Sequence, residues 1–161
     1  MDDDSLVKVH IDLPNHWSTN GEALWARSLG GDRYQIDNVP FFAYDLNFRD
    51  IVEAVAISPD LKPSVRRVLD RSGHRTMRVM FSDTVARDER LRLLQSLELL
   101  HVTFENNNSS HFALDLEPEA DATVVREQLE RWLAAEVLEY ETCESRVPGS
   151  FDDVPNEGDL R

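Results

Sequence analysis

The sequence has little of what marks secreted and membrane proteins. Its 161 residues include a single cysteine, Cys143, which cannot form an internal disulfide, whereas secreted chains of this size usually carry cysteine pairs. No apolar run approaches the roughly 18 residues that span a bilayer, and the chain begins Met-Asp-Asp-Asp instead of with a basic and then an apolar segment. These absences predict a cytoplasmic protein with no membrane partner. They favour Cys143 as a packed strand residue, with a reactive thiol as the minority interpretation.

Basic residues are also scarce. The chain has 17 Lys and Arg against 31 Asp and Glu, a formal net charge of −14. Residues 1–78 hold 10 basic and 12 acidic residues, and residues 79–161 hold 7 and 19, so the excess acid falls in the second half. An acidic surface repels phosphate backbones and attracts a basic protein. The composition therefore predicts a basic protein partner and no nucleic acid, and the simpler interpretation is that acidity only maintains solubility.

Alternating apolar and polar residues predict short β-strands in the first half. Such segments lie at residues 6–13, 22–27, 33–37, 41–44, 51–57 and 65–70. Five or six strands at this spacing are typical of a small, partly open barrel. We therefore predict a small N-terminal β-barrel-like domain over residues 1–73, with Trp25, Phe41 and Phe42 filling its core.

The second half mixes strand and helix patterns. Strand patterns occupy residues 76–81, 101–105, 111–117 and 137–143, and amphipathic helix patterns occupy residues 85–100 and 122–136. The order β-α-β-β-α-β predicts a ferredoxin-like unit over residues 74–145, so the fold class is α+β. Residues 146–161, rich in Pro, Gly and acidic side chains, predict a flexible acidic tail.

Side-chain oxygens precede both predicted helices. Residues 82–84, Ser-Asp-Thr, are expected to cap the first helix, and Asp121 is expected to cap the second. The spacing of Leu91, Leu94 and Leu97 predicts that these three leucines form the buried face of the first helix.

Four motifs stand in order between residues 24 and 79. They read L-W-A-R at residues 24–27, Y-x-I-D-N-V-P-F-F-A at 34–43, D-I-V-E-A at 50–54 and S-G-H-R-T-M-R-V at 72–79. By these motifs the chain, over roughly residues 22–140, resembles a bacterial family of small stand-alone proteins catalogued as a domain of unknown function. The resemblance implies no activity, cofactor or catalytic residue, so it assigns no role to any position.

The turn Ser72-Gly73-His74-Arg75-Thr76 is the best candidate for a site of chemistry. Ser72 and His74 have the residue types of a nucleophile and its base, but near neighbours on a turn rarely converge within hydrogen-bond reach. In the alternative interpretation the turn is a structural joint, where Gly73 supplies a positive φ and His74 and Thr76 bond to backbone groups. A hydrolase that uses His74 is therefore a minor alternative, and we assign no catalytic residue.

Arginines gather around this turn and offer an anion site. Guanidinium groups suit carboxylates and phosphates, so a second functional hypothesis is a small-molecule sensor that binds an anion at the seam between barrel and sheet. The residues of this alternative site are Arg67, Arg71, His74, Arg75 and Tyr44. Pairing of the arginines with carboxylates of the chain's own acidic second half is the favoured interpretation.

Histidine and aromatic patterns point to neither a metal nor RNA. The five histidines lack the i, i+4 spacing of a helical zinc motif and have no cysteine pairs beside them, so we predict no metal and no cofactor. RNA-binding modules of ferredoxin-like fold carry a basic, aromatic central strand, whereas residues 111–117 read H-F-A-L-D-L-E.

The leading hypothesis is a non-enzymatic acidic interaction protein, such as an immunity protein that neutralises a basic toxin. It rests on small size, the acidity of the second half and the absence of catalytic motifs. An acidic face would speed the capture of a basic partner and cover its site. The predicted binding residues are the carboxylates Glu127, Glu130, Glu136, Glu139 and Glu141. The identity of the partner and the oligomeric state are left open.

Overall fold

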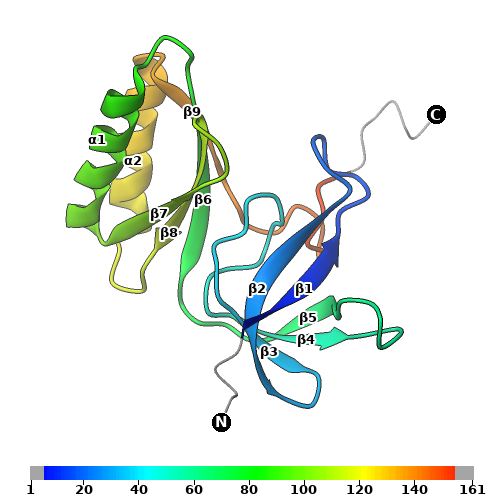
Figure 1. The fold of residues 1–161 in the computed structure, drawn as a ribbon. Coiled ribbons are helices and arrows are strands. Elements are labelled where there is room, and N and C mark those ends of the chain that lie inside the picture. Colours follow the sequence, from blue (N-terminus) through cyan, green and yellow to red (C-terminus); the bar gives the residue numbers. More distant parts are fainter. Residues whose placement is uncertain (1–5, 155–161) are drawn as a thin grey trace. The chain divides into compact units, whose positions relative to one another are not determined.

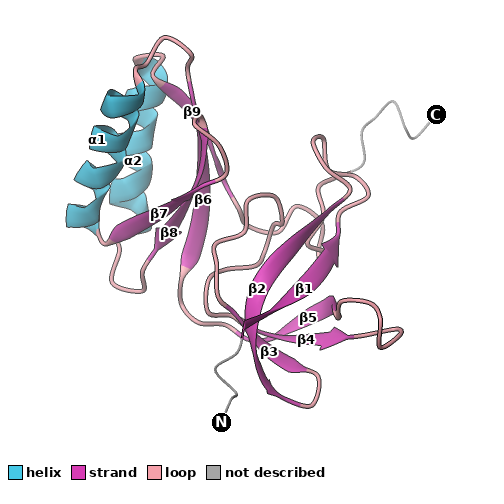
Figure 2. Cartoon of the chain, in the orientation of Figure 1, coloured by secondary structure: helices cyan, strands magenta, loops and turns pink. Residues whose placement is uncertain are grey.

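The chain folds into two units of a mixed α+β protein. The computed structural model describes residues 6–154, with two β-sheets and two α-helices in this range (Figures 1 and 2). The first unit combines residues 1–72 with residues 143–161, and the second unit comprises residues 73–142. The α+β class predicted from the sequence is confirmed. After residue 142, however, the chain returns to the first unit.

The first unit is built on five strands whose pairing closes into a ring. They are β1 (Leu6–Asp12), β2 (Gly21–Gly30), β3 (Arg33–Ile36), β4 (Ile51–Val55) and β5 (Ser64–Asp70). Neighbours in this order pair antiparallel, and β1 also pairs with β5 through His10 and Ser64. Successive side chains of a strand point to opposite faces, so the alternating apolar residues fill one interior. Its core includes Val9, Leu24, Val52 and Ala54.

Residues 41–44, which the alternation predicts as a strand, are irregular. The Glu22 carboxylate, which is buried, accepts three consecutive backbone N–H groups at this point: Phe41 at 2.6 Å, Phe42 at 3.0 Å and Ala43 at 2.9 Å. Pro40 precedes them and has no N–H to donate to a ladder. A side chain from β2 therefore replaces the strand partner that these residues would need.

The sequence predicts that Trp25 fills the core, and this prediction is wrong. Trp25 alternates with Leu24 and Ala26, which face the interior, so its ring points outward and is 43% exposed. The ammonium group of Lys8 lies 4.3 Å from the ring centroid. Phe42 is half-buried against the core, in line with the prediction.

The C-terminal segment, predicted as a flexible tail over residues 146–161, is anchored to the first unit at residues 151 and 152. The backbone N–H of Tyr44 donates to the Phe151 carbonyl at 2.9 Å, and the N–H of Asn15 donates to the Asp152 carboxylate at 2.8 Å. The Phe151 side chain packs on the core of the first unit. One aromatic ring and one carboxylate are enough to dock a segment of otherwise polar composition. Residues 155–161 lie outside the described residues.

The second unit is a four-stranded antiparallel sheet with both helices on one face (Figure 2). Its elements are β6 (Arg75–Phe81), α1 (Arg87–Ser96), β7 (Val102–Asn106), β8 (His111–Leu116), α2 (Ala122–Ala134) and β9 (Leu138–Thr142). The sheet order is β7-β8-β6-β9. Leucines of the helices pack against alternate residues of the strands, including Val79, Leu114 and Leu116.

The two helices begin differently. Asp121 caps α2, because its carboxylate accepts the N–H groups of Thr123 at 3.0 Å and Val124 at 3.4 Å, as predicted. The N-cap of α1 is Ala86, without a side-chain cap, since the hydroxyls of Ser82 and Thr84 bond to each other instead. The predicted cap at residues 82–84 is therefore wrong.

The C-terminal end of the predicted first helix is not α-helical. The α-helix ends at Ser96, and residues Leu97–Leu100 form a tighter 3₁₀ turn that ends at His101, where φ is 63°. Leu94 and Leu97 are buried as predicted, whereas Leu91 is 43% exposed.

The anchoring of the C-terminal segment predicts that Phe151→Ala destabilises the first unit. Because the ring is half-buried, we expect a loss of about 2 kcal/mol in the free energy of unfolding. The control is Val154→Ala, at an exposed position, for which we expect less than about 0.5 kcal/mol. Urea unfolding followed by tryptophan fluorescence in a Trp132→Phe background reports on the first unit, which holds Trp17 and Trp25. Equal midpoints for the two variants would contradict the docking.

A second prediction concerns the Glu22 carboxylate. Glu22→Gln presents an amide N–H to at least one of the three backbone donors, so we expect the first unit to lose about 2 to 4 kcal/mol. Glu53→Gln removes a carboxylate that pairs with the exposed side chain of Arg67, and should cost less than about 1 kcal/mol. The same fluorescence assay measures both. If both variants have the same unfolding midpoint as the parent protein, the three hydrogen bonds to Glu22 contribute nothing to stability.

Candidate functional site

Two of the predicted binding carboxylates lie on the exposed side of α2. Glu127 and Glu130 are both exposed, one helical turn apart. Together with Thr123 and Arg126 they line an open depression of about 330 Å³. Glu136 is exposed just beyond the helix, where its φ of 60° places it in a tight turn. We call Glu127, Glu130 and Glu136 the α2 acidic surface.

Glu130 is held by a neighbouring strand. The Tyr140 hydroxyl of β9 donates a hydrogen bond to its carboxylate. This bond, followed by partial burial, raises the pKa of Tyr140 above its ordinary value of 10.0, because only the neutral phenol can donate. The bond fixes one carboxylate of the α2 acidic surface against the sheet.

Glu139 and Glu141 face the other side of the sheet. Tyr140, between them, packs toward the helices, so its two neighbours point away. Glu141 accepts a hydrogen bond of 2.9 Å from Nε of Arg78, a side chain that is only 1% exposed. The five predicted carboxylates therefore form no single surface: three lie on the helix side, and Glu141 is engaged in an ion pair on the opposite face.

Within the turn from Ser72 to Thr76, the side chains of Ser72 and His74 form separate hydrogen bonds. The Ser72 hydroxyl donates to the Phe48 carbonyl at 2.7 Å. His74 Nδ1 lies 2.9 Å and 3.0 Å from the two carboxylate oxygens of Asp115. Gly73 has a φ of 95°, the positive value expected for a structural joint. These bonds favour the structural interpretation of the turn over a nucleophile and base.

Arg67 and Arg71 of the alternative anion site pair with carboxylates of the first unit. Arg67 lies 3.2 Å from Glu53. Arg71 binds the Asp45 carboxylate at 3.0 Å and the Asp50 carboxylate at 3.4 Å. Both arginines therefore pair within the chain, as the favoured interpretation has it, but their partners come from the N-terminal half and not from the acidic second half.

The other members of the alternative anion site are spread over both units. Tyr44 is buried in the first unit, with the guanidinium of Arg146 lying 4.6 Å from its ring centroid. His74 and Arg75 belong to the second unit, where Arg75 is exposed. Neither unit holds the five residues together.

Asp50 has a structural role that the sequence pattern does not reveal. Its side chain is fully buried and accepts the backbone N–H groups of Asn47 and Ser72, both at 2.9 Å. It also contacts Arg71. In the sequence, the D-I-V-E-A motif looks like the ordinary start of a strand. Only the folded structure brings Asp50 next to the backbone N–H of Ser72, 22 residues away in the sequence, and so explains the aspartate at this position.

The acidic charge is not concentrated in one unit. The second unit contains 7 basic and 14 acidic residues, a net charge of −7. The first unit, which includes the C-terminal residues, contains 10 and 17, also −7. The imbalance between the sequence halves disappears because residues 143–161, with a net charge of −3, belong with the first unit, whereas Arg75 and Arg78 belong with the second. Acidity is therefore a property of the whole molecule.

Neither a metal cluster nor a membrane helix is found between residues 6 and 154. No three His, Cys, Asp or Glu side chains in this range are grouped to hold a metal ion. No helix among these residues is long and apolar enough to cross a membrane.

The four motifs between residues 24 and 79 lie within the range that a family model matches. The model of the family described as "Domain of unknown function (DUF4265)" matches residues 22–140. The chain belongs to this family. The resemblance drawn from the motifs is thereby confirmed, and a search of curated proteins finds no match.

A solved structure shares the fold of this DUF4265 member. It is described as "Novel crystal structure of a hypothetical protein from Neisseria gonorrhoeae" and superposes with a TM-score of 0.73 over 87% of this chain and 95% of that chain. The two sequences are 19% identical. The similarity therefore extends to the fold and carries no activity with it.

The Tyr140 hydrogen bond leads to a pH prediction. Because the folded-state pKa is raised, the bond contributes to stability below the unfolded pKa near 10, and the contribution is lost as the pH rises through the folded value. Tyr140→Phe should therefore be slightly less stable than the parent at neutral pH and equally stable at strongly alkaline pH. Difference absorbance of tyrosinate between parent and variant should show Tyr140 ionising above pH 10. The bond is refuted if Glu130→Ala, which removes the acceptor, leaves the Tyr140 titration unchanged.

Proposed function

We propose that this protein is a non-enzymatic interaction protein that binds a basic protein partner through the α2 acidic surface. The observation that carries the proposal is the exposure of Glu127 and Glu130 around an open depression on one helix. Exposed carboxylates keep their charge in solvent and attract a basic surface over about a Debye length, roughly 8 Å at physiological salt. An immunity protein that neutralises a basic toxin is the specific form of this hypothesis.

The two alternative functions have less support. A hydrolase based on His74 would need a nucleophile in reach, and Ser72 donates its hydroxyl to a backbone carbonyl instead. The hydrogen bond between His74 and Asp115 would orient a general base, but a purely structural hydrogen bond has the same geometry. In the anion-sensor hypothesis, Arg67 and Arg71 would bind the ligand, but both already pair with carboxylates of the protein.

We propose that the second unit is ferredoxin-like, because the order β6-α1-β7-β8-α2-β9 is combined with a sheet in which β6 and β8 are central. We propose that the first unit is a small β-barrel, because β1 pairs with both β2 and β5. Both names describe scaffolds that serve many functions and do not choose among them.

Charge reversal tests the proposed function. The triple variant Glu127→Lys, Glu130→Lys, Glu136→Lys should slow association with a basic partner at least about tenfold at low salt, because electrostatic steering is reversed. The partner is first captured from the host lysate on the parent protein. Association rates are then measured across salt concentrations by surface plasmon resonance.

A matched variant separates the surface from the overall charge. Asp32→Lys, Asp60→Lys, Glu144→Lys makes the same change in net charge at exposed positions of the first unit. We expect it to slow association much less. Equal effects of the two triple variants would show attraction by net charge alone, and normal association of the α2 variant would refute the proposed surface. Glu139→Lys examines the opposite face of the sheet separately.

A further inference from the structure

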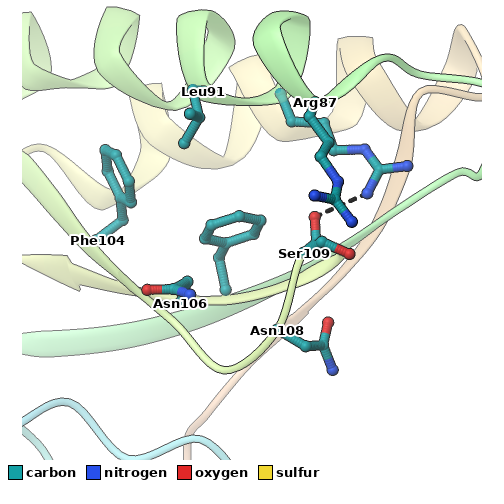
Figure 3. A pocket seen from close by; sticks show the side chains of 8 residues that line it. Arg87, Leu91, Phe104, Asn106, Asn108 and Ser109 are labelled. Carbon is teal, nitrogen blue, oxygen red and sulfur yellow. Dashed lines mark hydrogen bonds between the residues drawn. The ribbon is translucent and has the colours of Figure 1, made fainter.

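A second pocket of the second unit lies between α1 and the β7–β8 hairpin. Its volume is about 300 Å³, at the lower end of the range for small-molecule sites. In Figure 3, Arg87 and Leu91 descend from α1, Phe104 and Asn106 come from β7, and Ser109 comes from the hairpin turn. Arg90, Asn108 and Phe112 complete the lining.

The lining of this pocket is unusual in charge. In a chain of net charge −14, it contains two arginines, and no carboxylate among the described residues lines it. The acidic residues next to Arg87 in sequence are Asp88 and Glu89, and neither belongs to the lining. Glu89 is already paired with Arg92. The pocket is therefore a local positive site on an acidic protein.

Arg90 supplies one of the two positive charges from a buried position. Its side chain donates to the carbonyls of Val85 at 2.8 Å, Ser109 at 2.7 Å (dashed in Figure 3) and Ser82 at 3.2 Å, and to the Ser110 hydroxyl at 3.0 Å. All four acceptors are neutral. No carboxylate of the described residues pairs with this guanidinium, so its buried positive charge favours an anion nearby.

Arg87 supplies the second positive charge, and its guanidinium has none of the described residues as a hydrogen-bond or ion-pair partner. Asn106 lies across the pocket on β7. The Asn108 side-chain oxygen accepts the N–H groups of Ser110 and His111, which leaves its amide N–H₂ as a donor. Arg87, Asn106 and Asn108 line the same pocket, and guanidinium and amide groups are the donor types that bind a carboxylate or phosphate.

The remaining walls are apolar. Phe104 and Phe112 meet edge to face, with ring centroids 6.0 Å apart, and Leu91 exposes part of its side chain above them. These surfaces suit the face of an aromatic ring.

We infer that this pocket binds a small aromatic anion, with its carboxylate or phosphate at Arg87 and its ring against Phe104 and Leu91. Arg90 adds positive potential beneath the charged group and positions the hairpin through its bonds to Ser109 and Ser110. The site is independent of the α2 acidic surface and of the arginines at residues 67 and 71. The sequence could not reveal it, because Arg87 and Phe104 belong to elements that only the fold brings together.

Titrations with defined probes test the inference. Phenyl phosphate and benzoate should bind with affinities of about millimolar or tighter, and inorganic phosphate and benzyl alcohol should each bind at least about tenfold more weakly. Nuclear magnetic resonance of the parent protein should show shifts confined to the Leu91 methyl groups and the side-chain amides of Asn106 and Asn108. Comparison of phenyl phosphate with benzoate shows which anionic group the site prefers.

Two variants of the same helix provide the decisive comparison. Arg87→Gln should weaken the binding of the preferred probe by at least about tenfold, the effect of losing a charged hydrogen-bond partner. Arg92→Gln removes an equal charge outside the pocket and should change the affinity little. Phe104→Leu should weaken binding of the aromatic probes while leaving inorganic phosphate unaffected. Equal losses from the two arginine variants, equal binding of phosphate and phenyl phosphate, or the absence of localised shifts would each overturn the inference.

Discussion

In the first unit, one buried carboxylate supports the segment that no strand ladder holds. Glu22 satisfies three consecutive backbone N–H groups between Phe41 and Ala43. Each of these donors, if buried without an acceptor, would cost about 1 to 3 kcal/mol. Asp50 does the same for Asn47 and Ser72. The stretch between β3 and β4 can therefore stay irregular and still contribute buried side chains such as Tyr44.

The second unit uses a positive charge for the same purpose. Arg90 gathers carbonyl and hydroxyl oxygens from the segment before α1 and from the β7–β8 turn. A charged side chain that is bound to other groups of the protein is less available to bind a partner or ligand. Arg67 and Arg71 are paired on the first unit and Arg78 with Glu141 on the second, whereas Arg87 and Glu127 remain exposed. Counting charges along the sequence does not distinguish the two groups.

The distribution of charge shapes both proposals. Each unit carries −7, so a basic partner is attracted to the whole molecule and must be selected by a local surface. An anionic ligand meets the opposite problem, because the net charge repels it at long range. A pocket lined by Arg87 and Arg90 can hold such a ligand only through short-range, directed hydrogen bonds. Such a site would select anions by the geometry of their acceptor groups and not by charge alone.

The sequence by itself determined the features that depend on neighbours along the chain. Alternation at Val9 and Leu24 predicted strands, the Asp121 cap predicted the start of α2, and the motifs identified the family, because these signals act within a few residues. Only the tertiary structure decided which distant segments meet. The partners of Glu22 lie 19 to 21 residues away, and Asp152 binds Asn15 across 137 residues. Contacts of this range depend on how the strands close and where the chain returns, and no local pattern records either.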